Sequence, residues 1–163
     1  VVFTATTDAV LGTTCVAMLR VFRVKVLANV VTNSPIRVHN VGETVDYATI
    51  LAGNNQTMMA IYTVPASKTA YLTNYYASLN KDAGGGSPDV LVKMWVRDNA
   101  NSYERQIKHE MGLDSDASSQ FIHNFNPYFK ITEKSDIYLE GVNLSGTATA
   151  DVSAGFDIIL VDN

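Results

Sequence analysis

The three histidines are the first residues of this chain that could do chemistry, because neutral imidazole is a common metal ligand. His39, His109 and His123 fall in separate strand candidates, with neither an H-x-x-x-H nor an H-E-x-x-H spacing. In a strand, the side chains of His109 and Glu110 point to opposite faces and cannot hold one ligand together. We therefore expect structural or surface histidines and no metal site.

Paired carboxylates could bind calcium. Asp114 and Asp116 look like the start of an EF-hand loop, but Ser119 stands where that loop needs Gly and Phe125 where it needs Glu. We expect a solvated turn there.

A second pair of carboxylates, Glu133 and Asp136, flanks Lys134 and Ser135 in a hairpin-like turn. Two carboxyl groups can serve a glycosidase when one of them lies in an apolar pocket. An exposed turn offers no such pocket, so this pair does not predict a hydrolase.

Nucleophilic chemistry has no recognisable signature. The single cysteine, Cys15, has no His or acid close to it in sequence, and it excludes an intrachain disulfide. There is no G-x-S-x-G elbow, and the glycines at 84–86 lack the Lys-Ser/Thr of a phosphate loop. We predict no catalytic residue, no cofactor and no enzymatic activity.

Composition narrows the class of protein. The chain has 163 residues, 47% of them hydrophobic and 17% charged, against about 25% charged in average globular proteins. The net charge is -4 with no basic tract, which argues against nucleic acid as a partner. No apolar run approaches the roughly 18 residues of a membrane-spanning helix, so we expect no membrane partner.

The apolar residues alternate with polar ones almost throughout, which is typical of half-buried β-strands. We predict strands at 21–27, 36–40, 58–64, 69–79, 90–97, 103–111, 121–125, 128–132, 137–142 and 156–161. Such spacing predicts an all-β protein with an antiparallel, jelly-roll-like β-sandwich over 53–163. Residues 1–52 form a short β-rich N-terminal extension, and we expect one compact domain overall.

Residues 56–72, Q-T-M-M-A-I-Y-T-V-P-A-S-K-T-A-Y-L, carry a resemblance to a known family. They resemble β-sandwich structural proteins in the virions of tailed marine and cyanobacterial bacteriophages, whose pattern includes T-[IV]-P-A-G-K-T-A-Y-L. The resemblance covers about 50–163, through 92–97, 131–141 and 152–162, and extends more loosely over 16–41. Ser67 replaces the usual Gly, which predicts a type I turn or another turn that tolerates a Cβ.

The resemblance implies a function without catalytic residues. The implied protein is a capsid decoration (cement) protein. It is made in the host cytoplasm and binds the major capsid protein on the outside of the virion. It also implies self-association, with a homotrimer expected, and residues 1–16 have the composition of an arm that could add a strand to a neighbour. The alternatives are a receptor-binding or fibre-associated glycan-recognition module and a tail or neck component.

Interface candidates follow from residue type. Cations on the N-terminal strands could meet an acidic capsid surface, and aromatic residues could anchor a subunit contact. These candidates are Arg23, Lys25, Arg37, Tyr75, Tyr76 and Trp95. The alternative is a solvated face for the cations and the protein's own core for the aromatics. With Tyr62, Tyr71 and Tyr103, the aromatics could also form a sugar-stacking platform.

Overall fold

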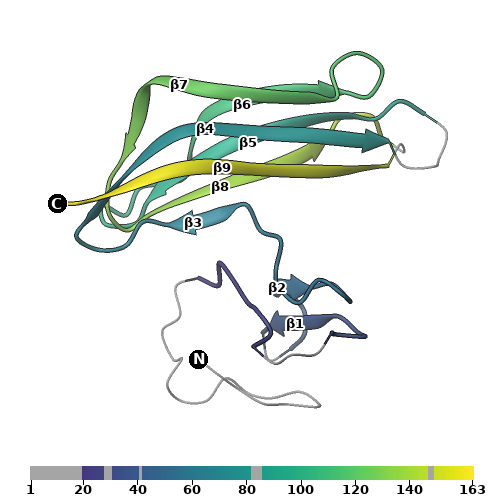
Figure 1. Cartoon of the computed structure of the whole chain (residues 1–163), viewed down its shortest axis with the longest axis horizontal. Helices are drawn as coiled ribbons and strands as arrows, with labels where there is room; N and C mark the ends of the chain where they lie inside the picture. The colour runs from purple at the N-terminus through teal and green to yellow at the C-terminus, as the bar shows by residue number, and fades with distance from the viewer. Residues whose placement is uncertain (1–19, 28–30, 41, 82–85, 147–148) are drawn as a thin grey trace. The chain divides into compact units, whose positions relative to one another are not determined.

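The computed structural model describes residues 20–27, 31–40, 42–81, 86–146 and 149–163, and every regular element in them is a β-strand (Figure 1). The all-β prediction is therefore confirmed. The chain divides into two compact units, Val1–Met59 and Ala60–Asn163, a few residues beyond the boundary expected at 52. No helix able to cross a membrane occurs among the residues that the structure describes.

In the part of the N-terminal unit that the structure describes, β1 (Ile36–His39) pairs antiparallel with β2 (Asp46–Ile50) as a hairpin. The carboxamide oxygen of Asn40 accepts the backbone N–H groups of Thr44 at 2.9 Å and Val45 at 3.0 Å, which closes the turn. The predicted strand at 36–40 is confirmed, whereas β2 was not predicted.

The predicted strand at 21–27 is wrong. This segment makes one isolated bridge, from Lys25 to Gln56, and belongs to no named strand. The segment opposite explains the interruption, because Gly53 (φ +83°) and Asn55 (φ +58°) have left-handed backbone conformations. Such residues turn the chain and cannot continue an extended ladder. Alternation along one segment predicts a strand only where a partner can pair with it.

The C-terminal unit is the β-sandwich. Its strands are β3 (Ile61–Thr63), β4 (Lys68–Lys81), β5 (Asp89–Asp98), β6 (Gln106–Asp114), β7 (Gln120–Ile131), β8 (Ser135–Asn143) and β9 (Ala150–Asp162). They form a four-stranded sheet, β3-β8-β5-β6, and a three-stranded sheet, β7-β4-β9, with all pairs antiparallel. Only the β5–β6 connection stays within one sheet, so each other connection ties the two sheets together.

Several strand boundaries differ from the sequence prediction. β3 begins at Ile61 instead of 58, and β9 begins at Ala150 instead of 156. The segments at 121–125 and 128–132 form one continuous strand, β7. β6 begins at Gln106 instead of 103, because the residues before it belong to the turn. There the carboxylate of Asp98 accepts the backbone N–H of Asn101 at 3.1 Å, and Ser102 has φ +58°.

The core lies between the two sheets. Burial alternates strictly along most of β5, as the period of two predicts. Along β4 the alternation is interrupted, because a bulge between Leu72 and Asn74 shifts the register and lets both Leu72 and Tyr75 face the core. The buried core residues are Val64, Ala70, Leu72, Tyr75, Ala77, Leu79, Val90, Val92, Met94, Val96, Leu113, Ile131 and Ile137.

The turn that carries the family resemblance has an unexpected backbone conformation. Ser67 has φ +63°, so it adopts the left-handed conformation that Gly would provide, and the type I interpretation is wrong. Its N–H donates to the carboxylate of Glu133, and its carbonyl accepts the N–H of Asn163 at 3.1 Å. These backbone contacts fix the turn although a Cβ is unfavourable there.

Ser67→Gly is therefore expected to raise the free energy of unfolding by up to about 1 kcal/mol, because it relieves the left-handed strain and keeps both backbone hydrogen bonds. Urea denaturation followed by circular dichroism measures the change. Ser67→Ala is the control and should stay within about 0.5 kcal/mol of the parent, since it keeps the strain. A less stable Ser67→Gly variant would contradict this account of the turn.

Candidate functional site

Three polar rings from three strands meet between the sheets. Tyr75 of β4 is fully buried, and its hydroxyl hydrogen-bonds to Nδ1 of His109 in β6. The ring of His123 in β7 stacks on His109, with centroids 3.9 Å apart and planes at 25°. β6 and β7 belong to different sheets, so this Tyr75–His109–His123 cluster joins one sheet to the other.

Phenylalanine side chains surround the cluster. Phe121 meets Tyr75 edge-on with centroids 5.2 Å apart, and Phe125 meets His123 edge-on at 4.7 Å. Burial, with a smaller contribution from the charge of Glu110, raises the pKa of Tyr75 to about 12. The phenol therefore stays protonated at neutral pH and can donate its hydrogen bond to a neutral His109.

His109 gives the sandwich a pH dependence. Burial lowers the pKa of His109, the charge of His123 lowers it further, and Glu110 opposes both. A histidine in the unfolded chain has a pKa of about 6.5, so below that pH the unfolded state binds more protons than the folded state. The contribution of His109 to stability is fully present above this pH and is lost as the pH falls through the folded-state pKa.

We expect the free energy of unfolding to decrease as the pH falls from about 7 to about 5.5, as urea denaturation at a series of pH values would show. His109→Gln should flatten this dependence, because a carboxamide oxygen can still accept from Tyr75 and does not titrate. A parent protein equally stable at both ends of this range would contradict the assignment.

The sequence did not predict that these residues meet. It separates His109 and His123 by a turn and places them on different strands, and only the strand register brings His123 beside Tyr75 in β4. Among the residues that the structure describes, no three His, Cys, Asp or Glu side chains lie together as a metal site would require. Two imidazoles and a phenol packed among phenylalanines make a structural contact that holds the two sheets together.

Asp136 corrects the expectation of an exposed turn at 132–136. Its side chain is only 1% exposed, and its two carboxylate oxygens accept from Thr63 Oγ1 at 2.6 Å and Asn99 Nδ2 at 2.9 Å. Thr63 lies on β3 and Asn99 in the β5–β6 turn, so neither is near Asp136 in sequence. Glu133 instead holds the backbone of Ser67, which gives the two carboxylates separate structural roles.

Trp95 lies on the outer face of the four-stranded sheet. Its indole N–H donates to Glu140 Oε2 at 2.7 Å, and the guanidinium of Arg105 lies 4.3 Å from the ring centroid. Arg105 also approaches Glu140 at 3.7 Å and donates to the hydroxyl of Tyr138 at 3.4 Å. The cation covers the ring face that a sugar would stack upon.

Tyr76 lies on the outer face of the other sheet. It stands between Ile122 of β7 and Gly155 of β9, and its ring lies against the glycine so closely that a Cβ there would be 2.6 Å from the hydroxyl. Tyr75, its neighbour along β4, has no exposed surface to offer a partner. Tyr75, Tyr76 and Trp95 thus occupy the core and two opposite faces, so these three do not share one sugar-stacking surface.

The three candidate cations lie on the N-terminal unit. Arg23 and Lys25 are exposed beside Gln56, whose side chain accepts from Arg23 at 2.9 Å. Arg37 lies 3.9 Å from Asp46 across the β1–β2 hairpin.

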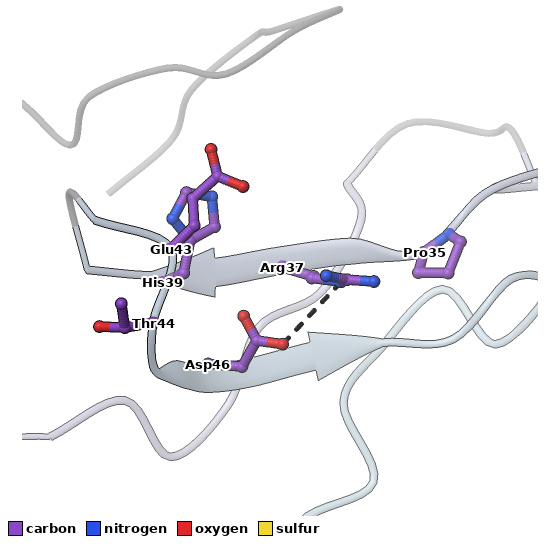
Figure 2. A pocket seen from close by; sticks show the side chains of 6 residues that line it. All are labelled: Pro35, Arg37, His39, Glu43, Thr44 and Asp46. Carbon is purple, nitrogen blue, oxygen red and sulfur yellow. Dashed lines mark ion pairs between the residues drawn. The ribbon is translucent and has the colours of Figure 1, made fainter.

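A polar recess of about 370 Å³ opens on this hairpin, with Arg37 and Asp46 facing each other within it (Figure 2). It is lined by Pro35, Arg37, His39, Glu43, Thr44 and Asp46. The side chains carry both signs of charge, so the recess does not select a ligand of one charge.

No protein-family model, curated protein or solved structure matches this chain. Its function is therefore inferred from its own side chains, from the sandwich that positions them, and from the strand–turn–strand motif that ends at Leu72.

Proposed function

We propose that this chain is a non-enzymatic virion structural protein of a tailed bacteriophage. In this proposal it is a decoration (cement) protein that binds the major capsid protein on the outside of the shell and stabilises it. The resemblance at 56–72 supports the family, and the antiparallel sandwich agrees with it.

The observation that carries the proposal is a set of large apolar side chains exposed on the outer face of the β7-β4-β9 sheet. Ile122 is 70% exposed there, and Tyr76, Ile159 and Val161 are all more than two-fifths exposed, with the exposed carboxylate of Asp157 between the two groups. Large apolar side chains exposed among polar groups mark a surface for another protein. Aromatic and aliphatic side chains with few charges are also what the centres of protein interfaces contain.

A cement role suits such a surface, because many copies on one shell add up modest contacts into a large stabilisation. The resemblance also implies trimers on the capsid exterior, which is a different assembly from the twofold pairing proposed in the next subsection. The glycan-recognition alternative has less support, since Arg105 already covers the ring of Trp95.

The test is cosedimentation of the purified protein with undecorated capsids and, separately, with host cells. We expect saturable binding to capsids and a higher temperature of capsid disruption. Ile122→Lys should weaken capsid binding, because it places a charge in the apolar face. Leu144→Lys, an exposed leucine in the loop after β8, is the matched control and should bind like the parent. Binding to cells but not to capsids would overturn the cement proposal in favour of receptor recognition.

A further inference from the structure

The four edges of the sandwich differ in how they are protected from pairing with another chain. An exposed strand edge invites such pairing, and proteins block it with short strands, bulges, prolines or lysines. β3 has only three residues. β6 has a bulge at Lys108, and β7 contains Pro127 and Lys130. Each of these three edges therefore carries a recognised form of protection.

β9 has none of these protections. It is 13 residues long and contains no proline, lysine or arginine, and in the described part of the chain no strand pairs with its outer edge. Its three charged residues are the acids Asp151, Asp157 and Asp162, the last of which is paired with Lys68. The edge is long and continuous, and it contains the apolar run Ile158-Ile159-Leu160-Val161, so it can accept an added strand.

The exposed side chains of β9 lie on both faces of the sheet. Ile159 and Val161 pair with Tyr71 and Thr69 on the outer face, whereas Leu160 pairs with the buried Ala70 on the core side. All three are at least 38% exposed. A partner on one face would cover only one set. A strand added in the plane of the sheet would flank both.

We propose that β9 pairs with β9 of a second copy of this chain, antiparallel about a twofold axis at Ile159. The two three-stranded sheets then form one six-stranded sheet. In this register Ile159 faces its own copy on the outer face, and Ile158 faces Leu160 on the core side. Tyr71 of β4 pairs with Ile159 within each copy, so the apolar side chains on the outer face continue from the axis into each sheet.

The charges of β9 agree with this register. Asp157 faces Val161 of the other copy, four residues from the second Asp157, so the two carboxylates are on the order of 13 Å apart. That exceeds the Debye length of about 8 Å at physiological ionic strength. A twofold axis at Asp157 would instead place two carboxylates directly opposite each other, which is unfavourable. Asp162 faces Phe156 of the other copy, beside Asp157 but on the other face of the sheet, and it is paired with Lys68 of its own chain. The proposed register therefore places no two carboxylates directly opposite each other.

Sedimentation equilibrium of the full chain at micromolar concentration tests the pairing, with the mass of two chains as the expected result. Ile159→Lys puts two ammonium groups opposite each other at the axis and should raise the dissociation constant about tenfold or more. Ile122→Lys, an exposed isoleucine in β7 of the same sheet, should remain a dimer. Unchanged circular dichroism and a cooperative urea transition would show that both variants fold, and loss of the dimer should itself lower the urea midpoint of Ile159→Lys.

Crosslinking tests the register. In a Cys15→Ser background, Ile159→Cys should form a disulfide-linked dimer on oxidation, because directly opposed strand residues lie within disulfide reach. Ile122→Cys should not. A monomeric or trimeric parent would overturn the proposal, as would a dimer unaffected by Ile159→Lys, and crosslinking through Leu160→Cys in place of Ile159→Cys would overturn the axis. None of these outcomes depends on capsid binding, so the pairing and the cement function can fail separately.

Discussion

Replacing Tyr75 with alanine is expected to lower the free energy of unfolding by about 3–5 kcal/mol, which is the usual cost of deleting a large buried aromatic ring. Tyr75 is the largest of the fully buried side chains, and its ring contacts Phe121, His109 and His123. The truncation leaves a cavity between the sheets and removes the hydroxyl that pairs with His109. Urea denaturation followed by circular dichroism measures the loss.

Two further variants test this assignment. One distinguishes the contribution of the Tyr75 ring from that of its hydroxyl, and the other is a matched control on the same strand. Tyr75→Phe keeps the ring and should cost about 1–2 kcal/mol, because Nδ1 of His109 loses its partner in a partly buried position. Tyr76→Ala removes the same side chain from the opposite face of β4, where 43% of it is exposed, and should cost about 1 kcal/mol or less. If Tyr75→Ala cost no more than Tyr76→Ala, the Tyr75–His109–His123 cluster would not be central to stability.

Asp136→Ala is expected to cost about 2–4 kcal/mol, because it removes a fully buried carboxylate and leaves two partly buried donors without their acceptor. Those donors are the hydroxyl of Thr63 and the carboxamide of Asn99, which bind one carboxylate oxygen each. The substitution removes the side-chain hydrogen bonds from β8 to β3 and to the β5–β6 turn. Thermal and urea unfolding of the purified variant give the size of the effect.

Asp136→Asn should cost less than Asp136→Ala, since its remaining oxygen can still accept from one of the two donors. The matched control is Asp157→Ala, which removes an exposed carboxylate from β9 and should change stability by less than about 0.5 kcal/mol. Equal effects of Asp136→Ala and Asp157→Ala would contradict the role assigned to the buried carboxylate.

The sequence predicted some residues of the candidate site but not their contacts. Residue types singled out Tyr75, Tyr76 and Trp95 among the aromatics, and each makes a specific contact in the folded chain. Their surroundings were not predictable, because the bulge after Leu72 decides which face of β4 each tyrosine occupies. Similarly, nothing local marks His123 as the residue that stacks on His109, since that contact joins two sheets.

The local pattern of residues was enough to predict that the sandwich is built of β-strands and where most of them lie. Side chains alternate between the faces of a strand, so a period of two can be read from neighbouring residues without knowing what lies opposite. Strands such as β5 and β8 were predicted in this way to within two residues, whereas the first six residues of β9 were missed. Which alternating segments find partners depends on long-range contacts: 21–27 does not form a strand because the chain opposite it turns at Gly53 and Asn55. The tertiary structure also decided the burial of Asp136 and the left-handed conformation of Ser67, because distant backbone and side-chain groups fix both.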